Sequence, residues 1–361
     1  MQQSATLQPI VTARAESPAS APSTQRRETS ASAARDTMSA IVHPAYGSPS
    51  VLRHTTVARA TIGANEVLVR VHAAAVCRGD VHILTGKPYL IRAMGYGLVR
   101  PKHPILGQDI AGTVEAVGDQ VSQFRPGDEV YGQVGHSGFA EYVAAPAERL
   151  APKPTNLSFE QAAAVPDSGM TALQGLRDLG QLKRGQSVLI NGASGGVGTF
   201  AVQIARALGA RVTAVCSTRH IGKLRSIGAD HVVDYTREDF TQLGERYDAI
   251  FDLVGNRRLS EYRRVLAPTG IYISSGGESG GNWISPLVWL AKVALTDVFV
   301  SQRIKALLVQ PRQDDLIALQ GLIESGQIEP VIERQYPLSE AIDAVRHVAA
   351  GHAQGKTVIR M

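Results

Sequence analysis

A glycine-rich turn carries the strongest chemical signal in the chain. The apolar run at residues 187–190 reads as a buried strand, four glycines crowd positions 192–198, and helical spacing of apolar residues begins at Thr199. Glycines in this order let the backbone approach a pyrophosphate, and the helix N-terminus offers it unpaired N–H groups. Ala193 replaces the first glycine, so the motif is A-x-G-x-x-G. We expect a dinucleotide site here; the alternative is a flexible turn that binds nothing.

The residues after the next strand indicate which dinucleotide binds. The run at 211–216 reads as a second strand. Enzymes that use NAD usually place Asp or Glu about 20 residues after the glycines, to hold the ribose 2′-hydroxyl. Residues 217–219 are Ser, Thr and Arg, and Lys223 follows. Because cations suit a 2′-phosphate, the sequence predicts NADPH as the cofactor, with a solvated basic face as the alternative.

Composition narrows the class of protein. A chain of 361 residues, 44% apolar and 19% charged, is typical of a soluble enzyme of two domains or one large one. The net charge of +5 is mild and no dense Lys/Arg run appears, so nucleic acid is not indicated as a partner. The two cysteines, Cys77 and Cys216, cannot build a disulfide framework, which fits a reducing compartment.

Two segments bear on localisation. Residues 1–37 are rich in Ser, Ala, Thr and Arg without an apolar period, and we expect a disordered tail. An organelle transit peptide, or a start codon placed too far upstream of Met38, are alternatives for these residues. The most apolar later segment, 283–300, contains Pro286, Lys292 and Asp297, which argues against a membrane span. We expect a cytoplasmic protein.

The remaining patterns predict a β-rich part followed by strand–helix units. Strands are expected at 41–42, 67–72, 129–131 and 138–143, a strand pair at 105–117, and a helix that begins at Ser158. After the glycine turn, strands are expected at 231–235, 249–255 and 270–274, helices at 316–325 and 338–350, and a last strand at 356–360 that returns to the β-rich part. This order indicates an α/β fold with a second, β-rich domain.

Several phrases together resemble the medium-chain dehydrogenase/reductase superfamily. They are A-Y-G-S-P-S-V-L, F-R-P-G-D-E-V-Y-G, G-F-A-E-Y-V, A-A-A-V-P-D-S-G-M-T-A-L-Q-G-L and N-G-A-S-G-G-V-G, and the resemblance runs from Met38 to the C-terminus. Within the superfamily the chain is most similar to the zinc-independent quinone oxidoreductase-like branch. That branch implies a GroES-like catalytic domain at 38–158, a Rossmann NADPH-binding domain at 159–305, a segment at 306–361 that returns to the catalytic domain, a cleft between the domains, and a homodimer.

The resemblance also implies which residues contact the cofactor. Ser194, Gly195, Gly196 and Val197 would lie on the pyrophosphate, Ser217, Arg219 and Lys223 on the 2′-phosphate, Tyr235 near the adenosine, and Leu253, Val254, Gly255, Ser274 and Gly276 beside the nicotinamide ribose. The apolar segment 283–300 would face the substrate and the dimer partner, or belong to the core.

Some members of this superfamily bind a catalytic zinc, so the zinc-ligand positions must be compared with this sequence. Its zinc alcohol dehydrogenases have a Cys ligand in a phrase similar to A-V-C-R-G-D-V-H, in which Cys77 stands here. Their second ligand is the His of a G-H-E phrase, which here reads G-Q-D with Gln108, and the third would fall at or near Asp167. An amide is a poor zinc ligand, and the loop of four cysteines that holds a structural zinc is missing. We expect no metal, and Cys77 to be either a thiol facing the cleft or a small buried residue.

A site without a Lewis acid favours an acceptor that is already electron-poor. Hydride transfer from NADPH to a quinone or conjugated enone needs only hydrogen-bond donors at the developing oxyanion. Cys77, Asp80, Gln108 and Asp167 are the catalytic candidates, with Asp109 beside them, and a structural hydrogen bond is the alternative for each carboxylate and amide. The sequence thus predicts an NADPH-dependent reductase of small hydrophobic electrophiles. A zinc alcohol dehydrogenase and a non-catalytic NADPH-binding protein remain as alternatives.

Overall fold

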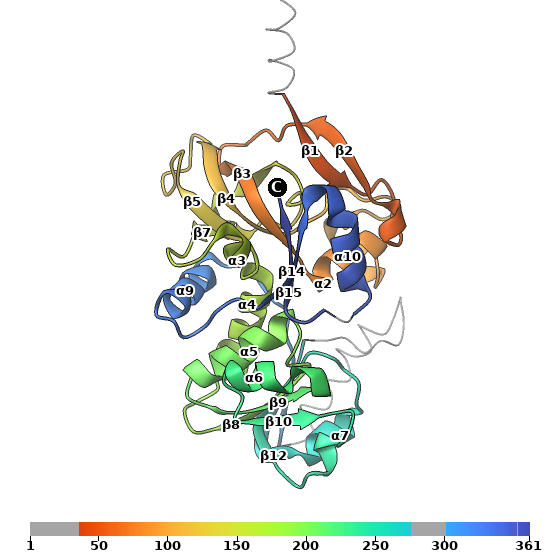
Figure 1. Ribbon diagram of the computed structural model, residues 1–361, viewed down its shortest axis with the longest axis vertical. Coiled ribbons are helices and arrows are strands. Elements are labelled where there is room, and N and C mark those ends of the chain that lie inside the picture. The colour runs from red at the N-terminus through yellow and green to blue at the C-terminus, as the bar shows by residue number, and fades with distance from the viewer. Residues whose placement is uncertain (1–35, 276–300, 352) are drawn as a thin grey trace, which may run out of the picture.

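The chain folds into a β-rich unit and a parallel-sheet unit, which lie at the top and bottom of Figure 1 with α3, α4 and α9 between them. The computed structural model describes residues 36–275, 301–351 and 353–361. The described residues therefore do not include the predicted tail up to residue 35, the predicted site residue Gly276 or the apolar segment 283–300. Within the described residues, β1 begins at Thr37, the last residue of the predicted tail.

The β-rich unit contains a seven-stranded sheet in the order β14-β15-β3-β4-β5-β7, with β6 paired to β3 and β1 paired to β2 beside it. The C-terminal strand β15 lies antiparallel to β3 and parallel to β14, so the end of the chain packs with this unit. Its elements are β1 (Thr37–Val42), β2 (Arg53–Ala58), β3 (Glu66–Val76), α2 (Arg78–Thr85), β4 (Asp109–Val117), β5 (Glu129–Gln133), β6 (Tyr142–Pro146), β7 (Leu150–Pro152), α3 (Phe159–Ala163), α9 (Gln313–Glu324), β14 (Ile332–Pro337), α10 (Ala341–Ala349) and β15 (Lys356–Arg360).

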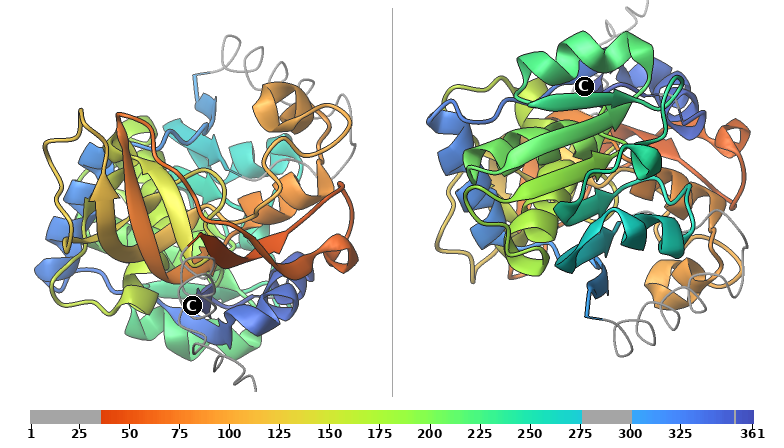
Figure 2. Two further views of the ribbon diagram at one scale, coloured as in Figure 1. Left: turned by 90° about the horizontal axis from the view of Figure 1, so that it is seen from above. Right: turned by 90° about the horizontal axis from the view of Figure 1, so that it is seen from below.

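The parallel-sheet unit confirms the predicted Rossmann fold. Its six strands follow the order β10-β9-β8-β11-β12-β13 and every described pairing among them is parallel, which is the 3-2-1-4-5-6 order of dinucleotide-binding sheets. The strands lie side by side in the right-hand view of Figure 2. The elements are α4 (Pro166–Leu173), β8 (Ser187–Asn191), α5 (Gly196–Ala207), β9 (Arg211–Cys216), α6 (Ile221–Ser226), β10 (His231–Asp234), β11 (Tyr247–Asp252), α7 (Leu259–Arg264), β12 (Leu266–Ser274) and β13 (Arg303–Ala306).

Alternation along the buried strands gives this sheet two apolar faces. Val188 and Ile190 of β8 pack with α5 in a large core, while Leu189 between them packs with α7 in a smaller one on the opposite face. The large core continues into the β-rich unit through residues such as Ala73 and Tyr131. One apolar core therefore joins the two units, and the polar site must be built at its edge.

Some local predictions differ from the structure. Helix α5 begins at Gly196, three residues before the expected Thr199. The stretch 105–117 forms one strand, β4, rather than a pair, because Gly107 has a φ of +101° and only Ile105 makes an isolated bridge, to Val42. Helix α2 was not predicted, because its eight residues include Gly79 and span too few turns to show a period.

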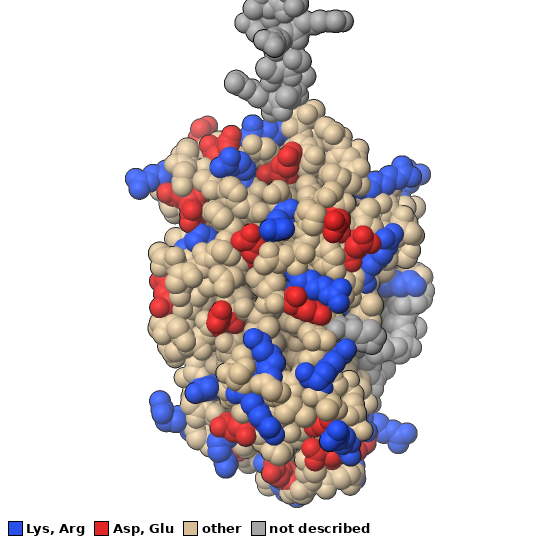
Figure 3. Space-filling view, in the orientation of Figure 1, with Lys and Arg blue, Asp and Glu red and all other residues tan. Residues whose placement is uncertain are grey.

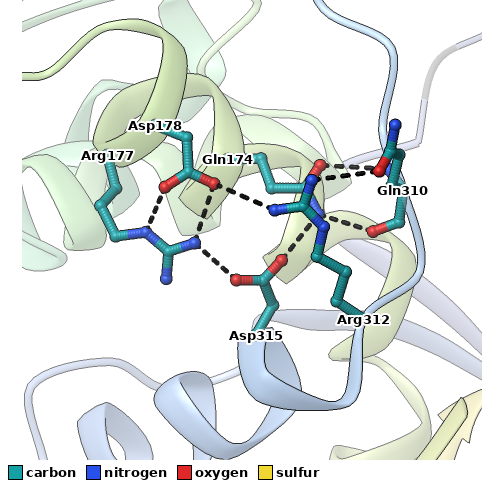
Figure 4. Close-up of polar contacts among 6 residues, drawn as sticks. All are labelled: Gln174, Arg177, Asp178, Gln310, Arg312 and Asp315. Carbon is teal, nitrogen blue, oxygen red and sulfur yellow. Dashed lines mark hydrogen bonds and ion pairs between the residues drawn. The ribbon is translucent and has the colours of Figure 1, made fainter. Parts of the chain in front are cut away.

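A network of charged and amide side chains attaches the chain after β13 to the parallel-sheet unit (Figure 4). Buried Asp315 of α9 accepts hydrogen bonds from Gln174 at 2.7 Å and Arg177 at 2.5 Å, and Gln174 also donates to the carbonyl of Gln310. The network consists of Gln174, Arg177, Asp178, Gln310, Arg312 and Asp315. Because a buried carboxylate is costly without partners, this network fixes where α9 begins against the short helix that contains Gln174 and Arg177.

The surface shows mixed charge. On the face drawn in Figure 3, Lys and Arg side chains alternate with Asp and Glu over both units. Among the described residues no helix is both long enough and apolar enough to cross a membrane.

Candidate functional site

The glycine turn has the geometry that a pyrophosphate cradle requires. Gly195 is the N-cap of α5, and a Cβ added to Gly198 would lie 2.3 Å from the carbonyl oxygen of Gly192, so only glycine lets the helix approach the turn this closely. Gly192 itself has a φ of +87°, which favours glycine. A Cβ on Gly195 would meet nothing nearer than 3.6 Å, which leaves space over the turn for a ligand. Ser194 and Val197 are half-buried beside it. These residues fit a dinucleotide.

The predicted 2′-phosphate residues form an exposed edge after β9. Ser217 caps the short helix Thr218–His220, and Arg219 and Lys223 are both exposed. The Arg219 Nε donates to His220 Nε2 at 3.0 Å, which leaves the terminal N–H groups of the guanidinium without a partner among the described residues. Tyr235, at the end of β10, is 56% exposed. The structure therefore brings these four residues to one edge of the sheet.

The residues predicted beside the nicotinamide ribose lie at the same edge. Parallel register places Asn191, Asp252 and Ser274 next to one another at the carboxyl ends of β8, β11 and β12. Leu253, Val254 and Gly255 follow directly, and Gly276 lies outside the described residues. Buried Asp252 accepts hydrogen bonds from the backbone N–H groups of Val254 and Gly255, at 3.1 and 3.0 Å, and so holds this turn. Sequence reasoning did not assign Asp252 a role.

Three of the catalytic candidates are joined by hydrogen bonds. The backbone N–H of Cys77 donates to Asp80 Oδ2 at 2.8 Å, and the Cys77 thiol donates to the same oxygen at 3.2 Å. Gln108 Nε2 in turn donates to Cys77 Sγ at 3.4 Å. Cys77 and Asp80 are buried, and Gln108 is 9% exposed. The structure thus supports the interpretation of Cys77 as a small buried residue rather than an open thiol.

Asp167 belongs to a second set of contacts next to the first. Its carboxylate accepts from Gln133 Nε2 at 3.0 Å, and its backbone N–H donates to Asp109 Oδ1 at 3.1 Å. The Lys356 Nζ lies 3.2 Å from the other oxygen of Asp109, and both side chains are almost fully buried. We call these seven residues the polar cluster: Cys77, Asp80, Gln108, Asp109, Gln133, Asp167 and Lys356.

Lys356 connects the polar cluster to the glycine turn. A Cβ added to Gly196 would lie 3.1 Å from the Lys356 Cδ, so the lysine stem passes directly against the start of α5. Lys356 belongs to β15, 247 residues after Asp109. Sequence reasoning missed both Lys356 and Gln133. No local pattern could have identified either residue, because each reaches the site only through sheet pairing.

Burial sets the protonation states in the polar cluster. It raises the pKa of the Cys77 thiol well above its usual value, and the nearby carboxylates raise it further. Burial also raises the pKa of Asp80 to about 6, although the donors of Cys77 oppose this. For Lys356, burial acts to lower the pKa, but Asp109 and the other acidic groups outweigh it and raise the pKa. At neutral pH the thiol is therefore protonated and the ammonium charged.

Tyr96 is a further residue that the sequence did not single out. It is half-buried, and its hydroxyl forms no hydrogen bond with another described residue. Burial raises the pKa of its phenol, Asp80 raises it further, and Cys77 adds to this while Arg149 opposes it. The Tyr46 hydroxyl donates to the Tyr96 carbonyl at 2.8 Å, which fixes the backbone at this position. Tyr96 therefore offers a protonated hydroxyl beside the polar cluster.

The residues at the zinc-ligand positions do not fit zinc. A catalytic zinc is usually held by three Cys, His or carboxylate ligands, and the set here is the thiol of Cys77, the amide of Gln108 and the carboxylate of Asp167. The Gln108 amide already donates a hydrogen bond to the Cys77 sulfur. Within the described part of the chain, no group of three or more His, Cys, Asp or Glu side chains is arranged to hold a metal ion.

A cavity among the described residues lies elsewhere. It measures about 510 Å³ and is lined by His72, Phe159, Glu160, Pro337, Leu338, Ser339, Arg360 and Met361, on the β-rich unit. No predicted site residue lines it, so it does not identify the active site.

Comparison with known proteins agrees with the fold and the glycine turn. Residues 63–155 match the family described as "Alcohol dehydrogenase GroES-like domain", and residues 227–359 match the family described as "Zinc-binding dehydrogenase". The mouse protein named "NAD(P)H oxidoreductase RTN4IP1, mitochondrial" is 33% identical over 93% of this chain and 92% of its own length. The Arabidopsis thaliana protein named "NADPH-dependent alkenal/one oxidoreductase, chloroplastic" is 31% identical over 89% of this chain and 79% of its own.

Solved structures give the same result. The structure titled as the quinone oxidoreductase from Coxiella burnetii superposes with a TM-score of 0.80 at 30% identity, covering 90% of this chain and 99% of its own. A likeness of this extent, in both sequence and structure, shows the family and the type of reaction. The chain belongs to the medium-chain dehydrogenase/reductase superfamily, in its quinone oxidoreductase-like branch, and is an oxidoreductase that uses a nicotinamide cofactor.

Proposed function

We propose that this enzyme uses NADPH to reduce quinones or conjugated alkenes and carbonyls without a metal ion. The observation that carries the proposal is the hydrogen-bonded set of Cys77, Asp80 and Gln108. Cys77 and Gln108 of this set stand where the zinc enzymes of the superfamily place metal ligands, and they bond to each other. The donor set has no His, and its amide is a poor ligand for a zinc ion that would polarise an alcohol.

The cofactor preference follows from charge at the end of β9. Arg219 and Lys223 are exposed there, and no acidic residue directly follows the strand. A guanidinium can form two charge-assisted hydrogen bonds with a phosphate, whereas a ribose hydroxyl gives it no counter-charge. The relative whose name includes "NADPH-dependent" is consistent with this preference. The rest of the cofactor would lie along the same edge of the sheet. The pyrophosphate would be held by Ser194, Gly195, Gly196 and Val197, and the nicotinamide end would be lined by Leu253 to Gly255 and Ser274.

The bound nicotinamide would supply a hydride to an electrophilic carbon of the acceptor. The protein must then stabilise the negative charge that develops on the acceptor oxygen. We assign this task to the hydroxyl of Tyr96, which is protonated and has no described partner. Asp167 is half-buried and orients Gln133. Cys77 and Asp80 are buried and act as positioning residues.

The surface near Tyr96 favours an apolar acceptor. Met94, Leu98 and Val99 flank Tyr96 in the chain and are 69%, 71% and 84% exposed. Large apolar side chains this open to solvent are commonly binding surfaces. Small hydrophobic electrophiles, with an electron-poor double bond or a quinone ring, are therefore the proposed substrates.

A panel of acceptors tests the proposal. Oxidation of NADPH would be followed at 340 nm with benzoquinones, naphthoquinones, alkenals and enones of increasing chain length, and simple aldehydes would serve as controls. Simple alcohols would be assayed in the other direction, with NADP⁺, because an alcohol donates a hydride. We expect turnover with at least one quinone or enone and none with the simple alcohols. In Tyr96→Phe, kcat should fall while the KM for NADPH stays unchanged. Binding of NADPH without turnover on any acceptor would contradict the proposal and favour a non-catalytic role.

A further inference from the structure

An acidic residue does lie at the edge where the 2′-phosphate is expected, although it does not follow β9. Strand β10 runs parallel to β9 with Asp234 opposite Cys216, so Asp234 ends its strand beside Ser217. The Thr218 hydroxyl donates to Asp234 Oδ2 at 2.5 Å. The other oxygen, Oδ1, accepts from the backbone N–H and hydroxyl of Thr236, at 3.0 and 2.7 Å. Asp234 thus belongs to the cofactor edge, and sequence spacing did not reveal it.

The charge of Asp234 opposes a phosphate. The Thr218 hydroxyl, the Thr236 donors and Arg237 together outweigh burial and lower the pKa of this carboxyl, so it is ionised at neutral pH. An acid at this edge favours a ribose 2′-hydroxyl and repels a 2′-phosphate. Asp234 is therefore in conflict with the NADPH preference unless its charge is compensated.

Arg237 is placed to compensate it. Its Nε lies 3.6 Å from Asp234 Oδ2, the same oxygen that Thr218 contacts. The Arg237 side chain is 75% exposed, whereas that of Asp234 is 6% exposed. A guanidinium has five N–H donors, so an arginine that faces Asp234 through Nε keeps its four terminal N–H groups for another anion. Arg219 and Lys223 follow β9 and Arg237 follows β10, so cations come from two adjacent strands.

We propose that Arg237 determines cofactor choice. By pairing with Asp234 it cancels the charge that would select a ribose hydroxyl, and it presents its free N–H groups to the 2′-phosphate. This inference rests on the proposed NADPH preference and adds a residue to it. Arg219, Lys223 and Arg237 together are called the basic rim below.

The test measures binding of adenosine 2′,5′-bisphosphate and of AMP by isothermal titration calorimetry, at fixed ionic strength. Four variants are compared with wild type: Arg237→Gln, Asp234→Asn, the double variant, and Arg211→Gln. Arg211 is the matched control, because it is an exposed arginine at the opposite end of β9. Because Arg237 is exposed, its variant should fold, and thermal melting would confirm this.

Arg237→Gln should weaken the bisphosphate about tenfold or more relative to AMP, because it removes a ligand and leaves Asp234 uncompensated. The double variant should regain part of that loss, and Arg211→Gln should change neither ligand. With the intact enzyme, Arg237→Gln should shift the ratio of kcat/KM for NADPH over NADH in the same direction.

Two outcomes overturn the inference. If Arg237→Gln behaves as Arg211→Gln does, or if the double variant binds the bisphosphate no better than the single one, Arg237 does not compensate Asp234. Suppose instead that the wild type prefers the bisphosphate over AMP, while Arg219→Ala removes this preference and Arg237→Gln does not. That result refutes only the role of Arg237. A wild type that binds both ligands equally refutes the NADPH assignment and this inference with it.

Discussion

The basic rim and the polar cluster differ in whether their charged side chains are exposed or buried. The rim leaves its cations exposed at the carboxyl ends of β9 and β10, where a ligand can reach them. The cluster buries its one cation, Lys356, against Asp109, and most of its polar atoms bond to one another. One region is therefore built to gain a partner from solution, and the other already has its partners.

This difference separates recognition from positioning. The three cations of the rim are exposed, and water and salt screen their charges, so each contributes little to stability. A buried pair such as Lys356–Asp109 cannot lose one partner without leaving a desolvated charge. Substitutions in the rim should change cofactor affinity while the fold survives, and substitutions in the cluster should change stability first.

The largest expected effect comes from Lys356→Met. Methionine keeps the apolar stem against Gly196 but removes the ammonium, which leaves Asp109 buried without its counter-charge. Breaking such a pair typically costs about 3–5 kcal/mol of the free energy of unfolding, measured by urea denaturation. In the double variant Lys356→Met/Asp109→Asn, most of that loss should be recovered. A loss below about 1 kcal/mol in the single variant would show that the pair is not as buried as the structure has it.

The next effect is a pH dependence that belongs to Asp80. Its folded pKa of about 6 lies above its usual value of 3.8, so the folded state holds the proton more tightly than the unfolded state. Stability from this group is therefore present at low pH and is lost as the pH rises through about 6. Relative to Asp80→Asn, the wild type should lose about 3 kcal/mol between pH 3 and pH 7, since the two pKa values differ by about two units and one unit is 1.36 kcal/mol. Parallel stability curves for the two proteins would contradict this.

A smaller effect, confined to cofactor binding, is expected in the rim. Arg219→Ala should raise the KM for NADPH about tenfold to 100-fold, because each charge-assisted bond contributes about 1.5–3 kcal/mol and 1.4 kcal/mol is tenfold. The KM for NADH should hardly change. Lys223→Ala should act in the same direction but less strongly, as a point charge on a flexible stem. An equal rise of the KM for NADPH and for NADH in Arg219→Ala would show that the guanidinium does not contact the 2′-phosphate.

The same contrast explains how much could be predicted from the sequence. The glycine turn and the strands at 211–216 and 356–360 were predicted with the bounds that the structure shows for β9 and β15, because short apolar runs beside glycines are local signals. Lys356, Gln133 and Asp234 carry no such signal. Each becomes part of a site only when strands distant in the chain pair, as β15 does with β3 and β10 with β9. Spacing within one segment therefore predicted the cradle, Arg219 and Lys223, but not the charged residues that other strands bring beside them.

The central claim, metal-free reduction with NADPH, is tested most directly by one assay on protein of known metal content. Zinc would be measured in the purified enzyme, and NADPH oxidation with the best quinone or enone would then be followed before and after prolonged treatment with 1,10-phenanthroline. We expect no stoichiometric zinc and an unchanged kcat after chelation. Stoichiometric zinc, together with oxidation of simple alcohols that is lost on chelation and restored by adding zinc back, would contradict it.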